Sequence, residues 1–254
     1  MPNFPSIPSI PSIHALCILC RTPSEVWCDF LQYFTRYKIY VMVDDESFDL
    51  LPFRKKYPRI TFVSVPSVTC RRFHFLDMNF TVSKKITSWE KAMYYFSLEI
   101  AGRHPHTWFL EDDVFFHSES SLVALDTNYP NADLLSPPIE ENTQGRKDYW
   151  HWCRIHVQLP PPHFFGMMCA VRLSTTLLQR IQEYAARCKT LFFLEALFPT
   201  VAKHHQLSTE HPPEMNTIYY RYGFTKDHVT RGSISLLSLY HPVKNLQEHN
   251  VFRT

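Results

Sequence analysis

The sequence predicts an α/β fold, in which a sheet flanked by helices forms a single domain. Short apolar runs of strand length alternate with segments that show helical periodicity. Acidic residues follow directly after two of these runs, which is where open α/β sheets bind their ligands. The length of 254 residues is sufficient for one large domain with a buried core.

Two capping signals mark helix starts. Thr22, Pro23 and Glu25 suit the N-cap, the first turn and the capping box of one helix, and Thr87 to Glu90 form a second capping box. The expected helices cover residues 23–34, 87–101, 174–188 and 192–203, and Pro199 is expected to bend or end the last of them. The expected strands are residues 14–20, 38–43, 60–65, 107–110, 133–135, 164–171, 217–222 and 234–240.

The first residues differ from the rest of the chain. Residues 5–13 repeat Pro-Ser-Ile, and proline at every third position prevents regular helices and strand ladders. Residues 1–13 are therefore expected to form an extended arm or a disordered tail. Residues 14–254 form the predicted domain. The proline-rich stretch 137–162, with aromatic residues at 149–152, is expected to be a functional loop.

Composition excludes several classes of protein. The five glycines lie too far apart for a dinucleotide fingerprint or a P-loop. The formal charge of +2 gives no argument for nucleic-acid binding, and no apolar run approaches the length of a membrane span. Cys17 and Cys20 lie in an apolar run, which indicates buried thiols, although redox or metal use stays open. Reduced thiols favour a cytoplasmic location.

Three consecutive carboxylates are the strongest chemical signal. Glu111, Asp112 and Asp113 follow the predicted strand 107–110 and precede another apolar run. Burying them without a counter-charge would cost several kcal/mol. Carboxylate oxygens suit hard divalent cations, so a Mn²⁺ or Mg²⁺ site is predicted here. The alternative is a solvated acidic turn.

In its order of motifs, the chain resembles the GT-A fold glycosyltransferases, whose Asp-x-Asp motif binds a metal and the diphosphate of a nucleotide sugar. Glu111 to Asp113 has the Glu-Asp-Asp form of that motif. The resemblance implies a Rossmann-like mixed sheet. It also implies that Asp113 binds the metal directly and that Glu111 lies near the ribose or donor sugar. Asp112 would support the metal through water or orient the loop. Small GT-A enzymes include virus-encoded ones.

The resemblance also implies residues that bind the donor. Asp44 and Asp45 follow the second strand, where a carboxylate can accept hydrogen bonds from uracil or ribose. Arg21 follows the first strand and is placed to meet the same nucleotide. Gly166 and, at the start of a helix, Lys91 or Trp89 are expected to border the donor sugar. The alternatives are a turn residue for Asp44 and a surface ion pair for Arg21.

Near the end of the chain, His241 matches the C-terminal histidine that many GT-A enzymes use as a metal ligand. Lys244 is expected to neutralise the leaving diphosphate. Glu195 lies alone in a strongly apolar helix, which raises a carboxyl pKa and suits it to proton transfer. The family form has an aspartate where this chain has Ala196. A buried structural role for Glu195 and a surface role for His241 stay open.

The resulting hypothesis is a metal-dependent, inverting glycosyltransferase. Residues 14–113 would bind a nucleoside-diphosphate sugar, expected to be UDP-linked and as small as UDP-xylose. Residues 114–254 would bind an oligosaccharide or glycoprotein acceptor. Two alternatives remain: a non-catalytic carbohydrate-binding module, and a nucleotidyltransferase or phosphohydrolase on a similar sheet.

Overall fold

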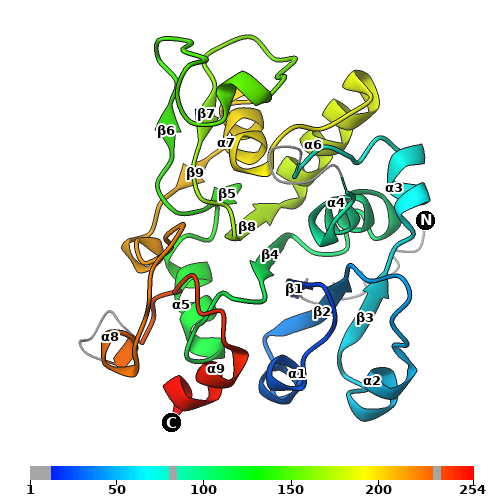
Figure 1. Ribbon diagram of the computed structural model, residues 1–254, viewed down its shortest axis with the longest axis vertical. Coiled ribbons are helices and arrows are strands. Elements are labelled where there is room, and N and C mark those ends of the chain that lie inside the picture. The colour runs from blue at the N-terminus through cyan, green and yellow to red at the C-terminus, as the bar shows by residue number, and fades with distance from the viewer. Residues whose placement is uncertain (1–12, 80–84, 231–235) are drawn as a thin grey trace, which may run out of the picture.

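A seven-stranded mixed sheet runs through the middle of the molecule, in the order β3-β2-β1-β4-β8-β5-β9 (Figure 1). The computed structural model describes residues 13–79, 85–230 and 236–254. The first four strands are parallel, β8 is antiparallel to both β4 and β5, and β9 is parallel to β5. The strands of this sheet are β1 (His14–Cys20), β2 (Tyr37–Val43), β3 (Thr61–Ser64), β4 (His106–Glu111), β5 (Leu134–Leu135), β8 (Ala170–Ser174) and β9 (Thr209–Glu210).

Helices cover both faces of the sheet. One layer contains α3 (Ser67–Arg72), α4 (Ser88–Tyr94), α6 (Thr175–Cys188) and α7 (Leu194–His204). The other contains α1 (Glu25–Leu31), α2 (Leu51–Lys56) and α5 (Glu119–Asn128), with α8 (Lys226–Thr230) and α9 (Leu246–Arg253) beside α5 and α1. Apart from this sheet, β6 (Glu140–Glu141) pairs with β7 (Phe164–Phe165). The predicted single α/β domain with a mixed sheet is confirmed.

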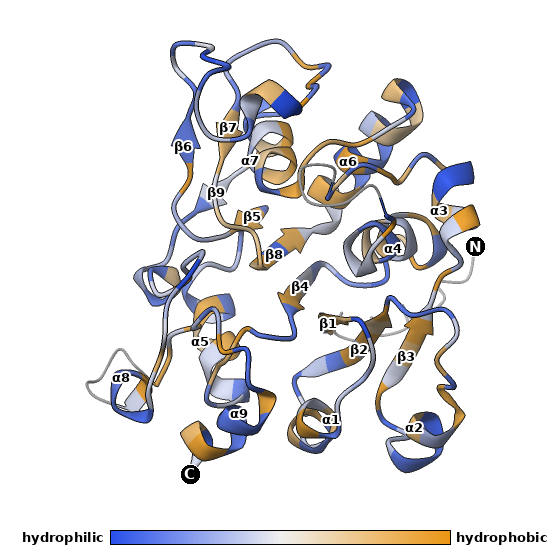
Figure 2. Ribbon diagram, in the orientation of Figure 1, coloured by the Kyte–Doolittle hydropathy of each residue, from blue (hydrophilic) through white to orange (hydrophobic). Residues whose placement is uncertain are grey.

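The alternation along β1 explains why two cores form. Ala15, Cys17 and Leu19 pack with the layer of α4, α6 and α7. Leu16, Ile18 and Cys20 point to the opposite face and pack with α1 and α5. Since both faces are covered, the strand is apolar after His14, and β1, β4 and β8 are largely hydrophobic in Figure 2. Cys17 and Cys20 are buried free thiols, as predicted.

Helix starts follow their capping residues. Thr87 and Glu90 form the predicted capping box of α4, and Ser174 caps α6. The predicted cap at Thr22 is wrong by two residues. Ser24 is the N-cap of α1, because its extended backbone allows its hydroxyl to accept from the Val26 N–H. The π-helical turn Tyr95–Glu99 continues α4.

Several predicted strands are wrong. Residues 164–171 divide into β7 and the beginning of β8, which belong to different sheets. Residues 217–222 do not form a strand; their one backbone pairing is a bridge between Ile218 and His241. In the predicted strand 234–240, residues 234–235 lie outside the described residues, and Tyr240 makes a single bridge to Phe115. The predicted arm also lies outside the described residues, except for Ile13.

Pro199 lies inside α7 without ending it. Because proline has no N–H, the carbonyl of Glu195 lacks its usual partner four residues on. The N–H of Gly166 donates to that carbonyl instead, at 3.0 Å. This hydrogen bond attaches the segment that leads into β8 to the first turn of α7. In the part of the chain that the structure describes, no helix is long and apolar enough to cross a membrane.

Candidate functional site

The acidic triplet lies at the carboxyl end of β4, and its backbone is held from several sides. The Asp112 N–H donates to the Leu19 carbonyl at 3.1 Å, and the Trp27 indole N–H donates to the Asp112 carbonyl at 2.8 Å. The Val243 N–H donates to the Asp113 carbonyl at 2.8 Å. This last bond fixes the segment after His241 to the triplet. The turn is therefore ordered by its surroundings.

Three side chains converge there: Glu111, Asp113 and His241. One ligand atom from each lies within 4.8 Å of the other two. His241 Nδ1 is 2.6 Å from the Tyr219 carbonyl, so Nδ1 carries the proton of that bond and Nε2 faces the carboxylates. His241 Nε2 is 3.3 Å from Asp113 Oδ1.

The chemistry of this group fits a divalent cation. Asp113 Oδ1 is buried and, beyond its contact with His241, has no hydrogen-bond partner among the described residues. A buried oxygen so poorly partnered is costly unless a ligand binds it. Two carboxylates and one imidazole are suitable ligands for Mn²⁺, and the carboxylates also suit Mg²⁺. Glu111, Asp113 and His241 could therefore hold such an ion.

The pKa values reflect crowded negative charge. Burial raises the pKa of Glu111, and the charge of Asp113 raises it further. Burial and Asp113 together raise the pKa of Asp112 to about 6. Burial alone would raise the pKa of Asp113, but the hydrogen bond and charge of His241 outweigh it and lower this pKa.

His241 responds in the opposite direction. Burial alone would lower its pKa, but the hydrogen bond to Asp113 and the charge of Asp113 raise it. A proton on His241 thus offsets part of the negative charge when no cation is bound. A cation at the same place would take over that role.

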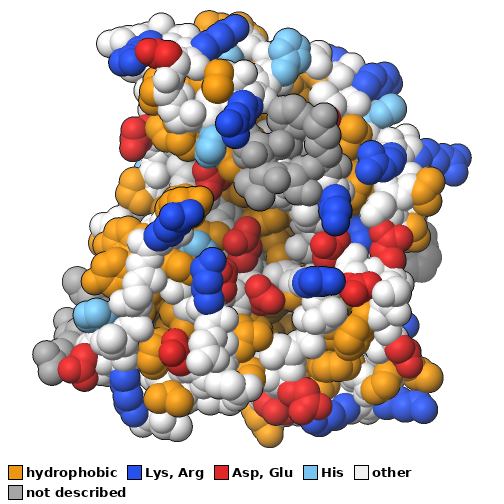
Figure 3. Space-filling model, viewed as in Figure 1, with side chains coloured by type: hydrophobic (Ala, Val, Ile, Leu, Met, Phe, Trp, Pro, Cys, Tyr) orange, Lys and Arg blue, Asp and Glu red, His pale blue; other side chains and the backbone are white. Residues whose placement is uncertain are grey.

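A cleft of about 250 Å³ adjoins the triplet. Its lining comes from the ends of β1, β2 and β4 and from the start of α4; it includes Arg21, Asp44, Asn79, Thr87, Ser88, Trp89, Glu111, Asp112 and Asp113. Figure 3 shows acidic side chains in the hollow at the middle of this face, with Lys and Arg side chains around it. The structure thus brings together five of the predicted site residues in this one cleft.

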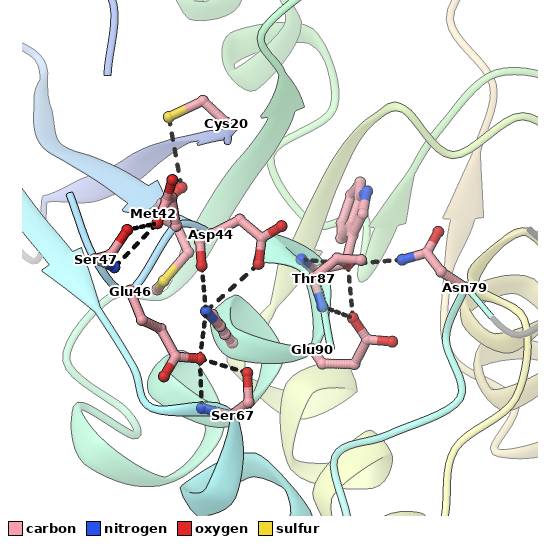
Figure 4. A network of polar contacts seen from close by, with 12 residues as sticks. Cys20, Met42, Asp44, Glu46, Ser47, Ser67, Asn79, Thr87 and Glu90 are labelled. Atoms are coloured by element: carbon pink, nitrogen blue, oxygen red, sulfur yellow. Dashed lines mark hydrogen bonds and ion pairs between the residues drawn. The ribbon is translucent and has the colours of Figure 1, made fainter. Parts of the chain in front are cut away.

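Lys91 and Asp45 lie near the cleft but are engaged elsewhere. The Lys91 side chain is only 1% exposed, and its ammonium group contacts the Asp44 carbonyl at 2.5 Å and Glu46 Oε1 at 3.1 Å. Figure 4 shows Asp44 and Glu46 in this network of polar contacts. Asp45 accepts hydrogen bonds from the Ser47 N–H and hydroxyl, and these two bonds stabilise a turn. Lys91 therefore holds Asp44 in place and does not line the cleft.

On the other side of the triplet lies Glu195, at the start of α7. Burial and the charge of Glu111 raise its pKa to about 7. No side-chain hydrogen bond or ion pair joins Glu195 to another residue within the three described ranges. This carboxyl group is free to exchange a proton with a ligand near neutral pH.

Gly166 and Lys244 flank the same region. A Cβ at Gly166 would lie 2.7 Å from the Pro138 carbonyl oxygen, so a larger residue there would displace the loop. Lys244 is exposed, and its charge contributes to lowering the pKa of Asp113. Lys244 thus lies close enough to the triplet to act on Asp113, whereas Gly166 is joined to the Glu195 carbonyl.

The sequence predicts Trp89 or Lys91 beside the donor, but it does not predict the contact of Trp89 with Glu111. Its indole N–H donates to Glu111 Oε1 at 2.7 Å, and Trp89, Thr87 and Asn79 line the cleft. The capping box showed that a helix begins here, but only the fold places its first turn against β4. Glu46, which binds Lys91, was also missed, since it lies in an ordinary polar turn.

Comparison with solved structures agrees with this architecture. The chain matches a structure of an active-site mutant of LgtC with a TM-score of 0.50 and 10% sequence identity, covering 94% of this chain and 95% of that chain. A second LgtC structure, a galactosyltransferase in complex with donor and acceptor sugar analogues, matches with a TM-score of 0.49 and 9% identity, covering 95% of each chain. Mouse xyloside xylosyltransferase 1 in its apo form matches with a TM-score of 0.45 and 11% identity, covering 92% of this chain and 98% of that chain.

These likenesses concern the fold. The match with a TM-score of 0.50 confirms the predicted GT-A type of architecture, a mixed sheet with helices on both faces. Neither the protein-family models nor the curated proteins compared with the chain match it. The activity must therefore be argued from the site.

Proposed function

We propose that this protein is a metal-dependent glycosyltransferase that uses a nucleoside-diphosphate sugar. The observation that carries the proposal is the group formed by Glu111, Asp113 and His241 at the mouth of a cleft lined by Arg21 and Asp44. Glycosyltransferases of this kind need a cation beside a nucleotide pocket because the leaving diphosphate carries concentrated negative charge. LgtC, a galactosyltransferase, is a precedent for sugar transfer on this fold.

In this proposal each side of the triplet has its own task. Arg21 and Asp44 bind the nucleotide, with Arg21 toward its phosphates and Asp44 toward hydroxyl or base N–H groups. Glu111, Asp113 and His241 would hold Mn²⁺ or Mg²⁺, which when bound supplies a Lewis acid that stabilises charge on the diphosphate. Asp112 lines the cleft beside them, and Lys244 adds a positive charge at the exposed margin.

Glu195 is the proposed base. A hydroxyl oxygen of the acceptor attacks the anomeric carbon, the bond from that carbon to the diphosphate breaks, and the acceptor proton passes to Glu195. The carboxyl pKa of about 7 suits this transfer. Direct displacement inverts the anomeric configuration. A product that retains the donor configuration would contradict this role of Glu195.

The same site is the basis for the more specific assignments of donor and acceptor. We assign a UDP-linked donor, with xylose among its candidates, and a glycan or glycoprotein acceptor. Residues 14–113 supply the nucleotide side of the cleft, and residues 114–254 supply Glu195, His241 and Lys244.

The test is turnover of a panel of nucleotide sugars, with and without Mn²⁺, by wild type and by Asp113→Ala. With one of the donors, wild type should release UDP in the presence of Mn²⁺ and not in its absence. Asp113→Ala should release no UDP under either condition. Glu183→Ala is the matched control, because Glu183 is a partly exposed carboxylate on α6 that pairs with Arg180 of the same helix. Equal turnover by wild type and Asp113→Ala would refute the proposal.

A binding measurement and the identity of the released products separate the two alternative functions. A carbohydrate-binding module would bind neither UDP nor Mn²⁺ in a calorimetric titration. A nucleotidyltransferase or phosphohydrolase would cleave a P–O bond of the donor and release sugar phosphate or UMP, whereas a glycosyltransferase releases UDP.

A further inference from the structure

Two tryptophan side chains contact the acidic triplet through their indole N–H groups. Trp27 reaches the backbone carbonyl of Asp112, whereas Trp89 reaches a side-chain oxygen of Glu111. Only the second contact acts on one of the three groups that could bind a cation. The two indoles therefore have different consequences for the site.

Trp89 itself is held rigidly. It is 3% exposed and packs against Phe109 and Phe198, with ring centroids 6.2 and 5.6 Å away. It is the second residue of α4, and the capping box fixes that helix start. Glu90 also accepts from the Met78 N–H at 3.0 Å. The position of the Trp89 indole is thus determined by packing and by the hydrogen bonds shown in Figure 4.

The hydrogen bond restricts Glu111 in a useful way. An indole N–H can only donate, so it engages an acceptor oxygen of Glu111. It engages Oε1 at 2.7 Å, and this leaves Oε2 available to a ligand. Without the bond, the Glu111 side chain would be free to turn about its own rotatable bonds. The affinity of a site for its metal ion decreases when the ligand side chains are not held in the right orientation.

We propose that Trp89 is a positioning residue that holds the Glu111 carboxylate for divalent-cation binding together with Asp113 and His241. This inference rests on one part of the proposed function, the binding of a divalent cation. It does not depend on the use of a sugar donor. It is therefore tested by metal binding, separately from turnover.

The experiment measures Mn²⁺ binding by electron paramagnetic resonance in wild type, Trp89→Phe and Trp108→Phe. Trp108→Phe is the matched control, because Trp108 is also buried in the core and its indole also donates to a carboxylate, Asp126, at 3.1 Å. Trp89→Phe should weaken Mn²⁺ binding roughly 10- to 100-fold. Trp108→Phe should leave the affinity within about twofold, since its partner lies outside the cation group.

A double-mutant cycle adds a readout that a general loss of stability would not produce. Once Glu111 is replaced by Ala, Trp89→Phe should have no further effect on Mn²⁺ affinity, because the indole has lost its partner. Unchanged affinity in Trp89→Phe would overturn the proposal. So would equal losses in Trp89→Phe and Trp108→Phe, or an additive cycle.

A measurement on wild type keeps the proposal testable if Trp89→Phe does not fold. In ¹⁵N–¹H spectra of the indole groups, Mg²⁺ should shift the Trp89 signal and leave the Trp108 signal in place. Absence of a Mg²⁺-dependent shift at Trp89 would contradict the proposal. Mn²⁺ binding that weakens in Trp89→Phe, without any turnover of nucleotide sugars by wild type, would refute the proposed function while supporting the role of Trp89.

Discussion

Largely buried carboxylates lie near both ends of β4, but their surroundings differ. At the amino end, Asp126 of α5 accepts hydrogen bonds from Arg172, Trp108 and Tyr37, and Arg172 Nη1 lies 2.6 Å away. At the carboxyl end, Asp113 has a buried oxygen whose one polar contact is with His241. Across the described ranges, no lysine or arginine forms an ion pair with the triplet.

The difference separates a structural carboxylate from one that can bind a ligand. The Asp126 side chain is 11% exposed and its charge is balanced by the fully buried Arg172. The Asp113 side chain is 23% exposed and faces two other carboxylates and one histidine. A buried charge that the fold itself pairs contributes to folding, whereas one without a permanent counter-charge needs a cation or proton from solution.

The largest expected effect is the loss of activity in Asp113→Ala. Removing a ligand of the proposed cation should lower Mn²⁺-dependent turnover on the order of 10² to 10³-fold, since such an ion supplies several kcal/mol of charge stabilisation. The free energy of unfolding should fall only slightly, because the lost contact with His241 is offset by the relief of repulsion with Glu111 and Asp112. Steady-state kinetics and urea unfolding of the same variant check both statements. A variant that loses activity only because it unfolds would contradict this comparison.

Asp126→Asn should show the reverse pattern. It leaves the Arg172 guanidinium buried without its counter-charge, which costs about 3–5 kcal/mol of the free energy of unfolding. Mn²⁺ affinity of the folded variant should stay at the wild-type value. Denaturant unfolding and Mn²⁺ titration measure the two effects. Reduced Mn²⁺ affinity in the folded variant would show that the two ends of β4 are coupled.

Glu195→Gln should change the pH dependence of turnover. Glu195 acts as a base only when deprotonated, so activity should be low below pH 7 and rise as the pH passes through the carboxyl pKa of about 7. Gln should remove this rising limb and reduce turnover at pH 8 roughly 100-fold. The profile of kcat/KM against pH checks this. A variant that keeps the rising limb would exclude Glu195 as its source.

The smallest expected effect concerns His106, at the amino end of β4. Burial and the charge of Arg172 lower the pKa of His106 to about 4. In the unfolded chain His106 takes up a proton below the ordinary histidine pKa of 6.5, whereas in the folded chain it does so only near pH 4. Stability is therefore complete above about pH 6.5 and decreases as the pH falls toward 4, by about 2 kcal/mol for a half-buried group.

His106→Phe should remove this contribution. Urea unfolding at pH 7 and pH 4.5 should show a smaller difference for the variant than for wild type. His204→Asn, at the exposed end of α7, is the control and should behave as wild type. An unchanged difference in His106→Phe would assign the acid sensitivity to other groups.

The sequence predicted the parallel half of the sheet and the long helices, because β1, β2, β4 and α6 have strong periodicity and capping signals. It missed α5, whose start has no side-chain cap and whose buried residues are few. It also mistook residues 217–222 for a strand. Their tyrosines suit a strand, but Tyr219, Tyr220 and Tyr222 are largely exposed and no neighbouring strand among the described residues pairs with them.

The site was predictable where chain order determines position. The ends of parallel strands meet at one edge of a sheet, which places Arg21, Asp44 and Glu111 along one cleft. The roles of Lys91 and Trp89 were not predictable, because each depends on which group a side chain meets after folding. A lysine and an indole carry the same sequence signal whether they contact a ligand or hold a neighbouring residue.

Pro199 has a consequence for how α7 responds to its surroundings. Any other residue at this position would supply an N–H that competes with the Gly166 N–H for the Glu195 carbonyl. With proline here, the backbone carbonyl of the proposed base stays hydrogen-bonded to the segment that follows the proline-rich loop. Movement of that loop would be transmitted through one backbone bond to the residue whose carboxyl group takes the proton.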